Sequence, residues 1–528
     1  MRLYRFAPAA LIVAGLVFRL AGAHSRFLNA DEAMHYLFSL QPSLVATYRS
    51  SLHTAHPPLL IILLHYWGMI SNDEFFLRLP SVLAGTASGW FLYAWLRRAT
   101  DGPAALIALA LFLLSPALIY LSFEVRQYAL LMAFMAGALY FFDRAVVEDS
   151  ACLMLESVLA LYLALLTHYC ALIFAFCLGC YAVLRMLSVR PRSGTVAVWA
   201  VGEAGAVALA TFFYRTHISL IRRVGMVQHV AESYLRGSLF QRGQESALAF
   251  VAKSNIRVFR FLFSQGAVAV VGLVLFLLAV VLLFATRADL ERRPNTASDR
   301  RPTPTQLGVL FLLPFVVNCA AAVADAYPYG GSRHNSYLAI FAIPAIATVL
   351  DRWKLRIFWI KPAVISATLA ICNFTVAPAG AYIAAKHQKR EFMSAAVDWV
   401  HRSIAPQSVI LADYESGLLL GNYVCHKNVT QTAPPFQLFY PSECASYESV
   451  TLMPPLWVFR DGTFPDQLPE LQRTLVANHL DGRQVWLFQA GFIVDREPEF
   501  RALLAQYGCP SQQEFGPNIF VCRISLPR

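Results

Sequence analysis

The chain has 528 residues, of which 57% are hydrophobic and only 14% are charged, and its formal net charge is +11. An average soluble domain is about 45–50% apolar and about 25% charged, so this composition excludes an ordinary soluble protein. A basic chain can bind nucleic acid, but no basic stripe interleaved with aromatic residues suggests such a groove. Basic residues also collect in the cytoplasmic loops of membrane proteins, and we therefore expect a membrane protein with no nucleic-acid partner.

The apolar residues lie in long uncharged runs, each close to the roughly 20 residues that a helix needs to cross a bilayer. Hydrocarbon cannot satisfy backbone donors and acceptors, so such runs must form helices. About eleven spans are predicted, at residues 7–23, 78–96, 103–121, 127–143, 151–167, 170–187, 195–213, 265–286, 306–324, 337–350 and 358–382. The first run, between Arg5 and Ala21-Gly22-Ala23, resembles a signal peptide, but we expect an uncleaved span because the acidic pair and many more spans follow.

Basic clusters predict the orientation of these spans. They lie at 1–5, 97–98, 144, 185–192, 287–301 and 352–356. All fall on one side, which the positive-inside rule makes cytoplasmic, so the N-terminus is expected in the cytoplasm of a multi-pass protein of the bacterial inner membrane. The outer side receives segment 24–77, the turn 124–128, loop 214–264 and the tail after 383. Within the first of these, Leu59 to Trp67 is apolar but short, which favours an interfacial helix.

Loop 214–264 does not follow the orientation rule. It places basic residues on the outer side, namely Arg215, Arg222, Arg223, Arg236, Arg242, Lys253, Arg257 and Arg260. One interpretation is a solvated or headgroup-binding amphipathic segment. The other is an anion site for a phosphate, and the sequence leaves both open.

The tail predicts a small α/β domain, because short apolar strands alternate with amphipathic helices. The expected strands are 409–412, 456–459, 485–488 and 519–521, and the expected helices are 391–402 and 498–507. We therefore divide the chain into a transmembrane helical domain, 1–385, and a periplasmic α/β domain, 386–528. Cys425, Cys444, Cys509 and Cys522 allow disulfides if this domain lies in an oxidising compartment. The other cysteines, Cys152, Cys170, Cys177, Cys180, Cys319 and Cys372, are expected to be small core residues.

Two polar motifs follow the first span. Asp31 and Glu32 can be two solvated acidic residues that mark the end of the span and have no further role. A carboxylate at the membrane surface can also deprotonate an acceptor hydroxyl or hold a divalent cation. His56 precedes two prolines that permit a helix to start, and a helix N-terminus favours anions. A turn histidine without a ligand is the alternative. Arg78 lies at the mouth of the second span.

Three further polar clusters are predicted at the outer ends of spans. Glu124, Arg126 and Tyr128 share one short turn, where charges close to hydrocarbon are expensive, although such residues often extend harmlessly to the interface. His168 forms the next outer turn. Gly330-Gly331-Ser332-Arg333-His334 precedes a late span; the glycines let a ligand approach the backbone, and an arginine can bind phosphate in bidentate fashion. An aromatic belt with an arginine anchor explains the nearby tyrosines, but it explains this run less well. Because the topology came from cytoplasmic residues alone, this gathering predicts an outward-facing active site.

Together these motifs resemble bacterial glycosyltransferases of the dolichyl-phosphate-mannose protein mannosyltransferase type (glycosyltransferase family 39), whose wider group includes the aminoarabinose transferase acting on lipid A. The resemblance covers residues 1 to about 345. It rests on Asp31-Glu32, His56-Pro57-Pro58-Leu59, Arg78-Leu79-Pro80-Ser81, Glu124-Val125-Arg126-Gln127-Tyr128, Thr167-His168-Tyr169 and Gly331-Ser332-Arg333-His334, in this order. It implies a C-type membrane glycosyltransferase fold, a polyprenyl-phosphate sugar donor, an outward-facing site and inversion at the anomeric carbon of a hexose or pentose.

The resemblance also implies residue roles. Asp31 matches the essential acid of the first outer loop, as general base or acceptor-orienting group, and Glu124 matches the acid of the second. These two residues are the catalytic candidates. His56 stands where many relatives have a lysine associated with the donor phosphate, and a neutral histidine is a weaker phosphate partner. The substrate-binding candidates are Glu32, His56, Arg78, Arg126, Tyr128, His168, Arg333 and His334. No metal ligand is assigned; a divalent cation could supply part of the positive charge, but no ligand spacing requires one.

Two other functions are compatible with a polytopic chain. A non-catalytic transporter or flippase for lipid-linked sugars would place polar residues near the bilayer midplane, often with inverted repeats, whereas here only Glu156 and Glu203 lie near span centres. A membrane-anchored sensor would leave the outer polar clusters unexplained. We expect an enzyme whose acceptor is a lipid, a glycan or a protein and which contacts membrane lipids.

Overall fold

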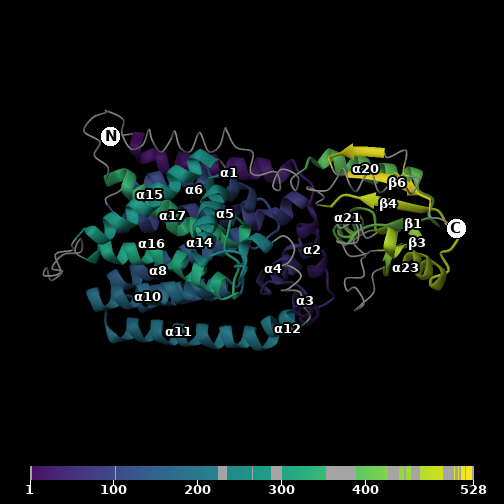
Figure 1. Cartoon of the computed structure of the whole chain (residues 1–528). Coiled ribbons are helices and arrows are strands. Elements are labelled where there is room, and N and C mark those ends of the chain that lie inside the picture. Colours follow the sequence, from purple (N-terminus) through teal and green to yellow (C-terminus); the bar gives the residue numbers. More distant parts are fainter. Residues whose placement is uncertain are drawn as a thin grey trace. The chain divides into compact units, whose positions relative to one another are not determined.

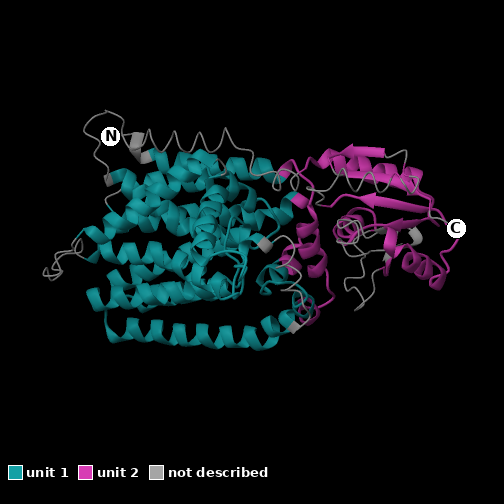
Figure 2. Ribbon diagram, viewed as in Figure 1, with its two compact units in different colours: residues 1–23, 48–63, 75–379 teal, residues 24–47, 64–74, 380–528 magenta. Residues whose placement is uncertain are grey.

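The structure is a computed structural model that describes residues 3–100, 103–223, 235–263, 266–286, 300–352, 388–425, 439–444, 447–452, 464–491, 505, 509, 513–517 and 519–525. The described chain is mainly helical, with one small sheet, as the sequence predicts (Figure 1). Its contacts divide it into two units (Figure 2). Unit 1 comprises residues 1–23, 48–63 and 75–379, and unit 2 comprises residues 24–47, 64–74 and 380–528.

Apolar runs become helices in the order that the sequence predicts. The helices before the sheet are α1 (Leu3–His24), α2 (Ala30–Ser39), α3 (Leu44–Ser51), α4 (Leu59–Trp67), α5 (Glu74–Ala99), α6 (Pro103–Leu113), α7 (Pro116–Ser122), α8 (Tyr128–Glu148), α9 (Ala151–Leu165), α10 (Ala171–Val189), α11 (Ser193–Phe213), α12 (Ser219–Arg223), α14 (Ala247–Phe263), α15 (Gly266–Ala285), α16 (Pro304–Val323) and α17 (Ala339–Arg352). Short π or 3-10 turns are η1 (Tyr214–Ile218), η2 (Arg236–Ser238) and η4 (Arg333–Leu338). The predicted span 358–382 lies outside the described residues.

Among the described helices, six are long and apolar enough to cross a membrane: α1, α8, α10, α11 with its continuation to Arg222, α15 and α16. The pair α6 and α7 would make a seventh. The apolar helix α9 is shorter. The expected number of about eleven spans therefore remains a prediction.

The predicted span at 103–121 forms two helices rather than one continuous helix. The chain bends by 62° between α6 and α7. Pro116 is the first residue of α7 and Ser115 its extended N-cap, because proline has no N–H to donate and disfavours a helical conformation in the residue before it. The Ser115 hydroxyl donates to the Leu262 carbonyl, 2.9 Å away in α14. The hydrophobicity of the run alone does not predict this break between α6 and α7.

A buried ionic network joins three helices of unit 1. The Asp143 carboxylate on α8 accepts hydrogen bonds from Trp95 Nε1 on α5 at 2.6 Å and from Arg185 Nε on α10 at 2.8 Å. The Tyr181 hydroxyl also donates to it, at 2.9 Å. A charge buried without such partners would be strongly unfavourable, so this network fixes the relative positions of α5, α8 and α10.

Unit 2 contains a mixed six-stranded sheet in the order β2-β3-β1-β4-β6-β5. Its strands are β1 (Val409–Leu411), β2 (Pro441–Cys444), β3 (Tyr447–Leu452), β4 (Val485–Gln489), β5 (Gln513–Gly516) and β6 (Ile519–Ile524). β1 pairs in parallel with β3 and β4, and the other described pairings are antiparallel. The predicted strands at 409–412, 485–488 and 519–521 are confirmed; 456–459 lies outside the described residues, as does 498–507 apart from residue 505.

Helices cover both faces of this sheet. On one face, Ile410 and Phe488 pack with α20 (Arg390–Ser403), α21 (Tyr414–Tyr423) and residues of α2. On the other, Val409 and Leu487 pack with α23 (Phe464–Ala477). This alternation follows the two-residue period of a strand, and α20 confirms the helix predicted at 391–402.

The cysteines divide as their surroundings predict, with one exception. Disulfides join Cys425 to Cys444 and Cys509 to Cys522. Cys170 and Cys177 are buried, and Cys180 and Cys319 are partly buried. The prediction that Cys152 is a core residue is wrong: it is exposed, because it lies one residue after the start of α9 on the helix's outer face. Cys372 lies outside the described residues.

Candidate functional site

Four aromatic side chains from distant parts of the sequence meet in unit 1, and we call them the ring cluster. They are His56 before α4, Tyr128 at the start of α8, His168 between α9 and α10, and His334 in η4. All six pairs of rings have centroids 5.0–6.5 Å apart. The closest pair is His56 and His168, at 5.0 Å. All four were predicted as substrate-binding residues, and the structure brings them together.

The turns that bear these rings are held by backbone contacts. The Leu59 N–H donates to the Leu166 carbonyl at 3.0 Å, so the segment after His56 is joined to the segment before His168. The Tyr327 hydroxyl donates to the His334 carbonyl at 3.1 Å. Burial raises the pKa of the Tyr327 hydroxyl far above its usual range, which keeps it a neutral donor.

Two guanidinium groups lie beside the ring cluster. The Cζ atom of Arg126 is 5.7 Å from the centre of the Tyr128 ring, and that of Arg333 is 6.0 Å from the same centre. Arg126 and Tyr128 are both buried, whereas Arg333 is partly exposed. Fixed positive charge next to buried rings favours a negatively charged ligand, and guanidinium groups match phosphate oxygens in geometry.

His168 is a neutral hydrogen-bond donor. Its Nδ1 accepts the Cys170 backbone N–H at 3.1 Å, so the ring proton is on Nε2. Burial, and then the charges of Arg126 and Arg333, lower the pKa of His168 to about 3. Nε2 is buried and has no hydrogen-bond partner among the described residues. A phosphate oxygen is a suitable acceptor for this N–H.

Three residues close in sequence to Tyr128 and His334 were not predicted as substrate-binding residues. The Gln127 amide, Asn335 Oδ1 and the Ser336 hydroxyl are buried and lack hydrogen-bond partners within the described parts of the chain. A buried polar group without a partner costs about 1–3 kcal/mol, which favours a role toward a ligand. Only their positions next to Tyr128 and His334 could have indicated them, because amides and hydroxyls are common in turns.

Two further candidates of unit 1 are Glu124, in the turn before Tyr128, and Arg78, which lies on α5 and contacts the end of α1. Glu124 is buried, and its backbone carbonyl accepts the Arg126 N–H at 2.7 Å. Ser81 on α5 donates its hydroxyl to the Arg126 carbonyl at 3.2 Å, which ties α5 to this turn. Arg78 is fully buried and donates to the Ala23 carbonyl at 2.9 Å, near the end of α1. Arg78 thus satisfies a carbonyl at a helix end.

Asp31 and Glu32 lie in unit 2, in the first turn of α2. Glu32 is buried, and its carboxylate accepts the Asn29 backbone N–H at 2.9 Å and the Asn29 side-chain amide at 2.8 Å. The Asn29 side chain accepts the Glu32 N–H in return, at 3.2 Å, which completes a capping box. Asp31 is partly exposed, and its backbone carbonyl is 2.7 Å from His35 Nδ1. The pattern Asn-x-x-Glu could have revealed this cap in the sequence.

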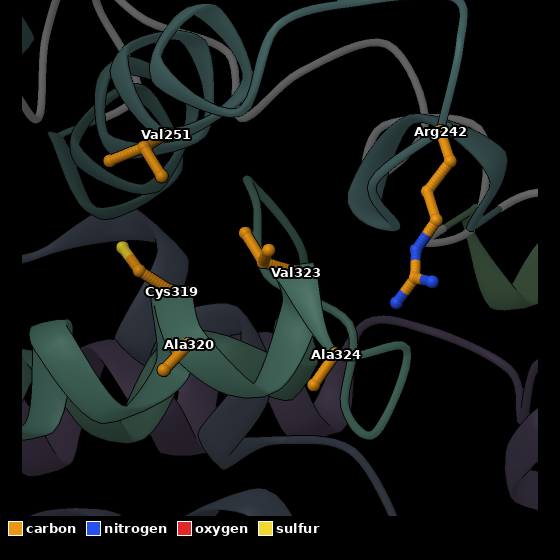
Figure 3. Close-up of a pocket in the computed structure, with 6 residues that line it drawn as sticks. All are labelled: Arg242, Val251, Cys319, Ala320, Val323 and Ala324. Atoms are coloured by element: carbon orange, nitrogen blue, oxygen red, sulfur yellow. The ribbon is translucent and has the colours of Figure 1, made fainter.

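Within the described residues, no group of three or more His, Cys, Asp or Glu side chains is arranged to hold a metal ion. A separate apolar pocket of about 490 Å³ lies in unit 1 (Figure 3), lined by Arg242, Val251, Cys319, Ala320, Val323 and Ala324. In Figure 3 the Arg242 guanidinium extends toward the Ala324 end of the pocket. Arg242 is one of the basic residues of loop 214–264.

Comparisons with known proteins agree with this architecture. The family model for dolichyl-phosphate-mannose-protein mannosyltransferase matches residues 55–214. A search of curated proteins finds no significant match. The crystal structure of ArnT from Cupriavidus metallidurans in the apo state is similar with a TM-score of 0.54 at 13% sequence identity, over 98% of this chain and 99% of that chain.

Two further solved structures are less similar. ArnT from Cupriavidus metallidurans bound to undecaprenyl phosphate has a TM-score of 0.47 at 14% identity, over 98% of this chain and 99% of that chain. The oligosaccharyltransferase AglB from Archaeoglobus fulgidus, in complex with an inhibitory peptide and a dolichol-phosphate, has a TM-score of 0.46 at 11% identity, over 92% of this chain and 70% of that chain.

The comparisons confirm the predicted resemblance and the fold class. The apo structure shows that the protein has the fold of ArnT, with a mainly helical part and a small sheet. The family match includes three members of the ring cluster, His56, Tyr128 and His168, and the turn that bears Glu124 and Arg126.

Proposed function

We propose that the protein is an integral-membrane glycosyltransferase that transfers a hexose or pentose from a polyprenyl-phosphate donor to an acceptor hydroxyl. The observation that carries this proposal is the ring cluster with the Arg126 and Arg333 guanidinium groups beside it. Preorganised donors and positive charge at one buried place stabilise a departing phosphate. The matching family model, named for a dolichyl-phosphate-mannose donor, supports the same donor class here.

The proposed reaction is a single displacement with inversion at the anomeric carbon. The acceptor oxygen forms a bond to this carbon on the face opposite the phosphate, and the bond between the carbon and the phosphate oxygen breaks. The polyprenyl phosphate leaves with the electron pair of that bond, and a base takes the hydroxyl proton of the acceptor. His168 Nε2–H donates to a phosphate oxygen, and the two arginines offset the negative charge.

We assign the base to Asp31 and propose Glu124 as a second catalytic acid. The carboxylate of Asp31 is on a turn that the Glu32–Asn29 capping box holds in one conformation. Because Glu32 is used in that cap, Asp31 is the acid of the pair that is suited to accept a proton. Glu124 is buried in the turn before α8, two residues from Arg126.

We place the reaction on the periplasmic face of a bacterial inner membrane, with the N-terminus in the cytoplasm. The disulfides of unit 2 support an oxidising compartment for that unit, since thiols stay reduced in the cytosol. The basic clusters support the same orientation. Lipids, glycans and proteins all offer acceptor hydroxyls, and the fold is compatible with each.

Transfer can be tested before the sugar is identified. Membrane lipids and glycans from cells with and without the protein are compared by mass spectrometry, and the differing product is followed with Asp31→Asn. We expect this variant to stay in the membrane and to lose transfer by about 10²-fold or more, because it cannot accept the proton. Asp73→Asn, at an exposed position of the same outer segment, is the matched control.

Normal transfer by Asp31→Asn would remove Asp31 from the mechanism. If no glycan or lipid differed between the two strains while polyprenyl-phosphate sugars accumulated on one side of the membrane, the transporter alternative would replace the enzyme.

A further inference from the structure

His217 lies in the π-helical turn η1, near the C-terminal end of the helix that runs from Ser193 to Arg222. Figure 1 shows the two parts of this helix, α11 and α12. A π turn inserts an extra residue into an α-helix and is often found at functional sites. His217 is 1% exposed, although its neighbours Tyr214 and Arg215 are exposed. Within this turn, only the side chain of His217 is buried. The π turn therefore lies where a side chain of this helix packs against other segments.

The His217 ring makes hydrogen bonds to two different segments of unit 1. Nε2 is 2.8 Å from the Thr54 carbonyl and 3.2 Å from the Leu52 carbonyl, in the segment that leads to His56. Nδ1 is 2.5 Å from the Tyr169 hydroxyl, which follows His168 directly. One imidazole thus joins the segments that bear the closest pair of the ring cluster.

These partners define the protonation state of the ring. Carbonyl oxygens only accept, so Nε2 carries the proton and donates to Thr54. Nδ1 is then an acceptor, and the Tyr169 hydroxyl donates to it. Burial raises the pKa of Tyr169, so its hydroxyl keeps the proton it donates. Each ring nitrogen has a partner of the complementary kind.

We propose that His217 is a positioning residue that sets the separation of His56 and His168 and so shapes the donor-phosphate site. This inference rests on the proposed function. His217 supplements the direct bond between Leu59 and Leu166: that bond fixes the backbone after His56, and His217 fixes the backbone before it. Thr54 transmits the constraint, because its hydroxyl accepts the His56 N–H at 3.3 Å.

The experiment uses the full-length protein in lipid nanodiscs, with undecaprenyl phosphate as the probe. His217→Phe removes both hydrogen bonds, whereas His217→Gln keeps a side-chain N–H close to the Thr54 carbonyl. Tyr169→Phe removes only the hydrogen bond between the Tyr169 hydroxyl and His217 Nδ1. The control is Tyr162→Phe, since the Tyr162 hydroxyl donates to the Gly202 carbonyl at 2.9 Å and likewise joins the α9 region to the helix of His217, away from the ring cluster.

We expect His217→Phe to weaken undecaprenyl phosphate binding by about tenfold, because preorganisation of the site is lost, and His217→Gln to stay within about threefold of the native affinity. Tyr162→Phe should leave the affinity unchanged even if it lowers thermal stability. Equal affinities for His217→Phe and the native protein would overturn the inference, and so would an equal loss in Tyr162→Phe. If His217→Phe does not fold, Tyr169→Phe decides: loss of the bond to Nδ1 should weaken undecaprenyl phosphate binding, and native affinity in Tyr169→Phe would overturn the inference.

A second readout separates this inference from the proposed function. Imidazole ¹⁵N chemical shifts of His56 and His168 are measured without any lipid phosphate. Shifts that move in His217→Phe but not in Tyr162→Phe support the positioning role, even if the native protein binds no undecaprenyl phosphate and the proposed function fails. Unchanged shifts in His217→Phe would overturn the positioning role.

Discussion

The burial of His168 predicts how the free energy of unfolding changes at low pH. Its pKa in the folded protein is lowered to about 3, while an unperturbed histidine has a pKa of about 6.5. At pH 7.5 both the folded and unfolded states hold a neutral ring. Between about pH 6.5 and pH 3 only the unfolded state binds the proton, so protonation stabilises the unfolded state and the folded state loses stability as the pH falls.

The perturbation is His168→Asn, whose side-chain oxygen can still accept the Cys170 N–H. In the unfolded state this histidine has a pKa of about 6.5, so pH 5 lies about 1.5 units below it. Proton binding then stabilises the unfolded state by about 2 kcal/mol relative to pH 7.5. The native protein should therefore lose about 2 kcal/mol more stability than the variant over this interval.

The assay is reversible unfolding in mixed detergent micelles at pH 7.5 and pH 5, followed by tryptophan fluorescence, for the native protein and His168→Asn. Other titrating groups contribute equally to both proteins and cancel in the difference. If the two proteins lost the same stability between these pH values, His168 would not be held neutral by burial, and its role as a fixed N–H donor would be refuted.

Substitutions at three other places, Arg333, Glu32 and the Cys425–Cys444 disulfide, test separate parts of the structure. Arg333→Gln should weaken undecaprenyl phosphate binding by about 10–100-fold, since a charge-assisted bond contributes about 1.5–3 kcal/mol, and nanodisc binding assays measure this; an unchanged affinity would exclude a phosphate contact. Glu32→Ala should lower the free energy of unfolding by about 1 kcal/mol through loss of the cap, while Glu32→Gln, which can still cap, should be nearly neutral in the same unfolding assay; equal losses would argue against the capping role. Replacing Cys425 and Cys444 by serine should destabilise unit 2 by about 2–4 kcal/mol, seen as faster limited proteolysis after Arg402, and native protease resistance would show that this disulfide is dispensable.

The helical elements could be predicted because each apolar run has a length that only a helix can satisfy in hydrocarbon. Hydrophobicity says nothing of where such a run bends, and this is why the break at Pro116 appears only in the structure, although the proline itself was visible. The strands at 409–411 and 485–489 were predictable for a similar reason, since short apolar runs between turn residues favour buried strands.

The candidate site was only partly predictable. His56, His168 and His334 were identified one at a time from turns at the outer ends of apolar runs, but their ring contacts depend on tertiary packing between segments up to 278 residues apart in the sequence. His217 gave no signal, because it lies near the end of an apolar run and its role depends on a π turn. Glu32 illustrates the opposite case, since a local capping pattern explains a residue that the acidic pair suggested as a ligand.

The surroundings of His56 explain why a histidine, rather than a lysine, suits this position. A lysine there would add a third cation beside the Tyr128 ring, which already has the Arg126 and Arg333 guanidinium groups about 6 Å from its centre. Like charges in a buried site repel, and burying an ammonium group costs more than burying a neutral imidazole. In the proposed phosphate site the two arginines supply the positive charge, and His168 contributes a neutral donor. On this reasoning a histidine at position 56 is compatible with the proposed preference of the site for an anion.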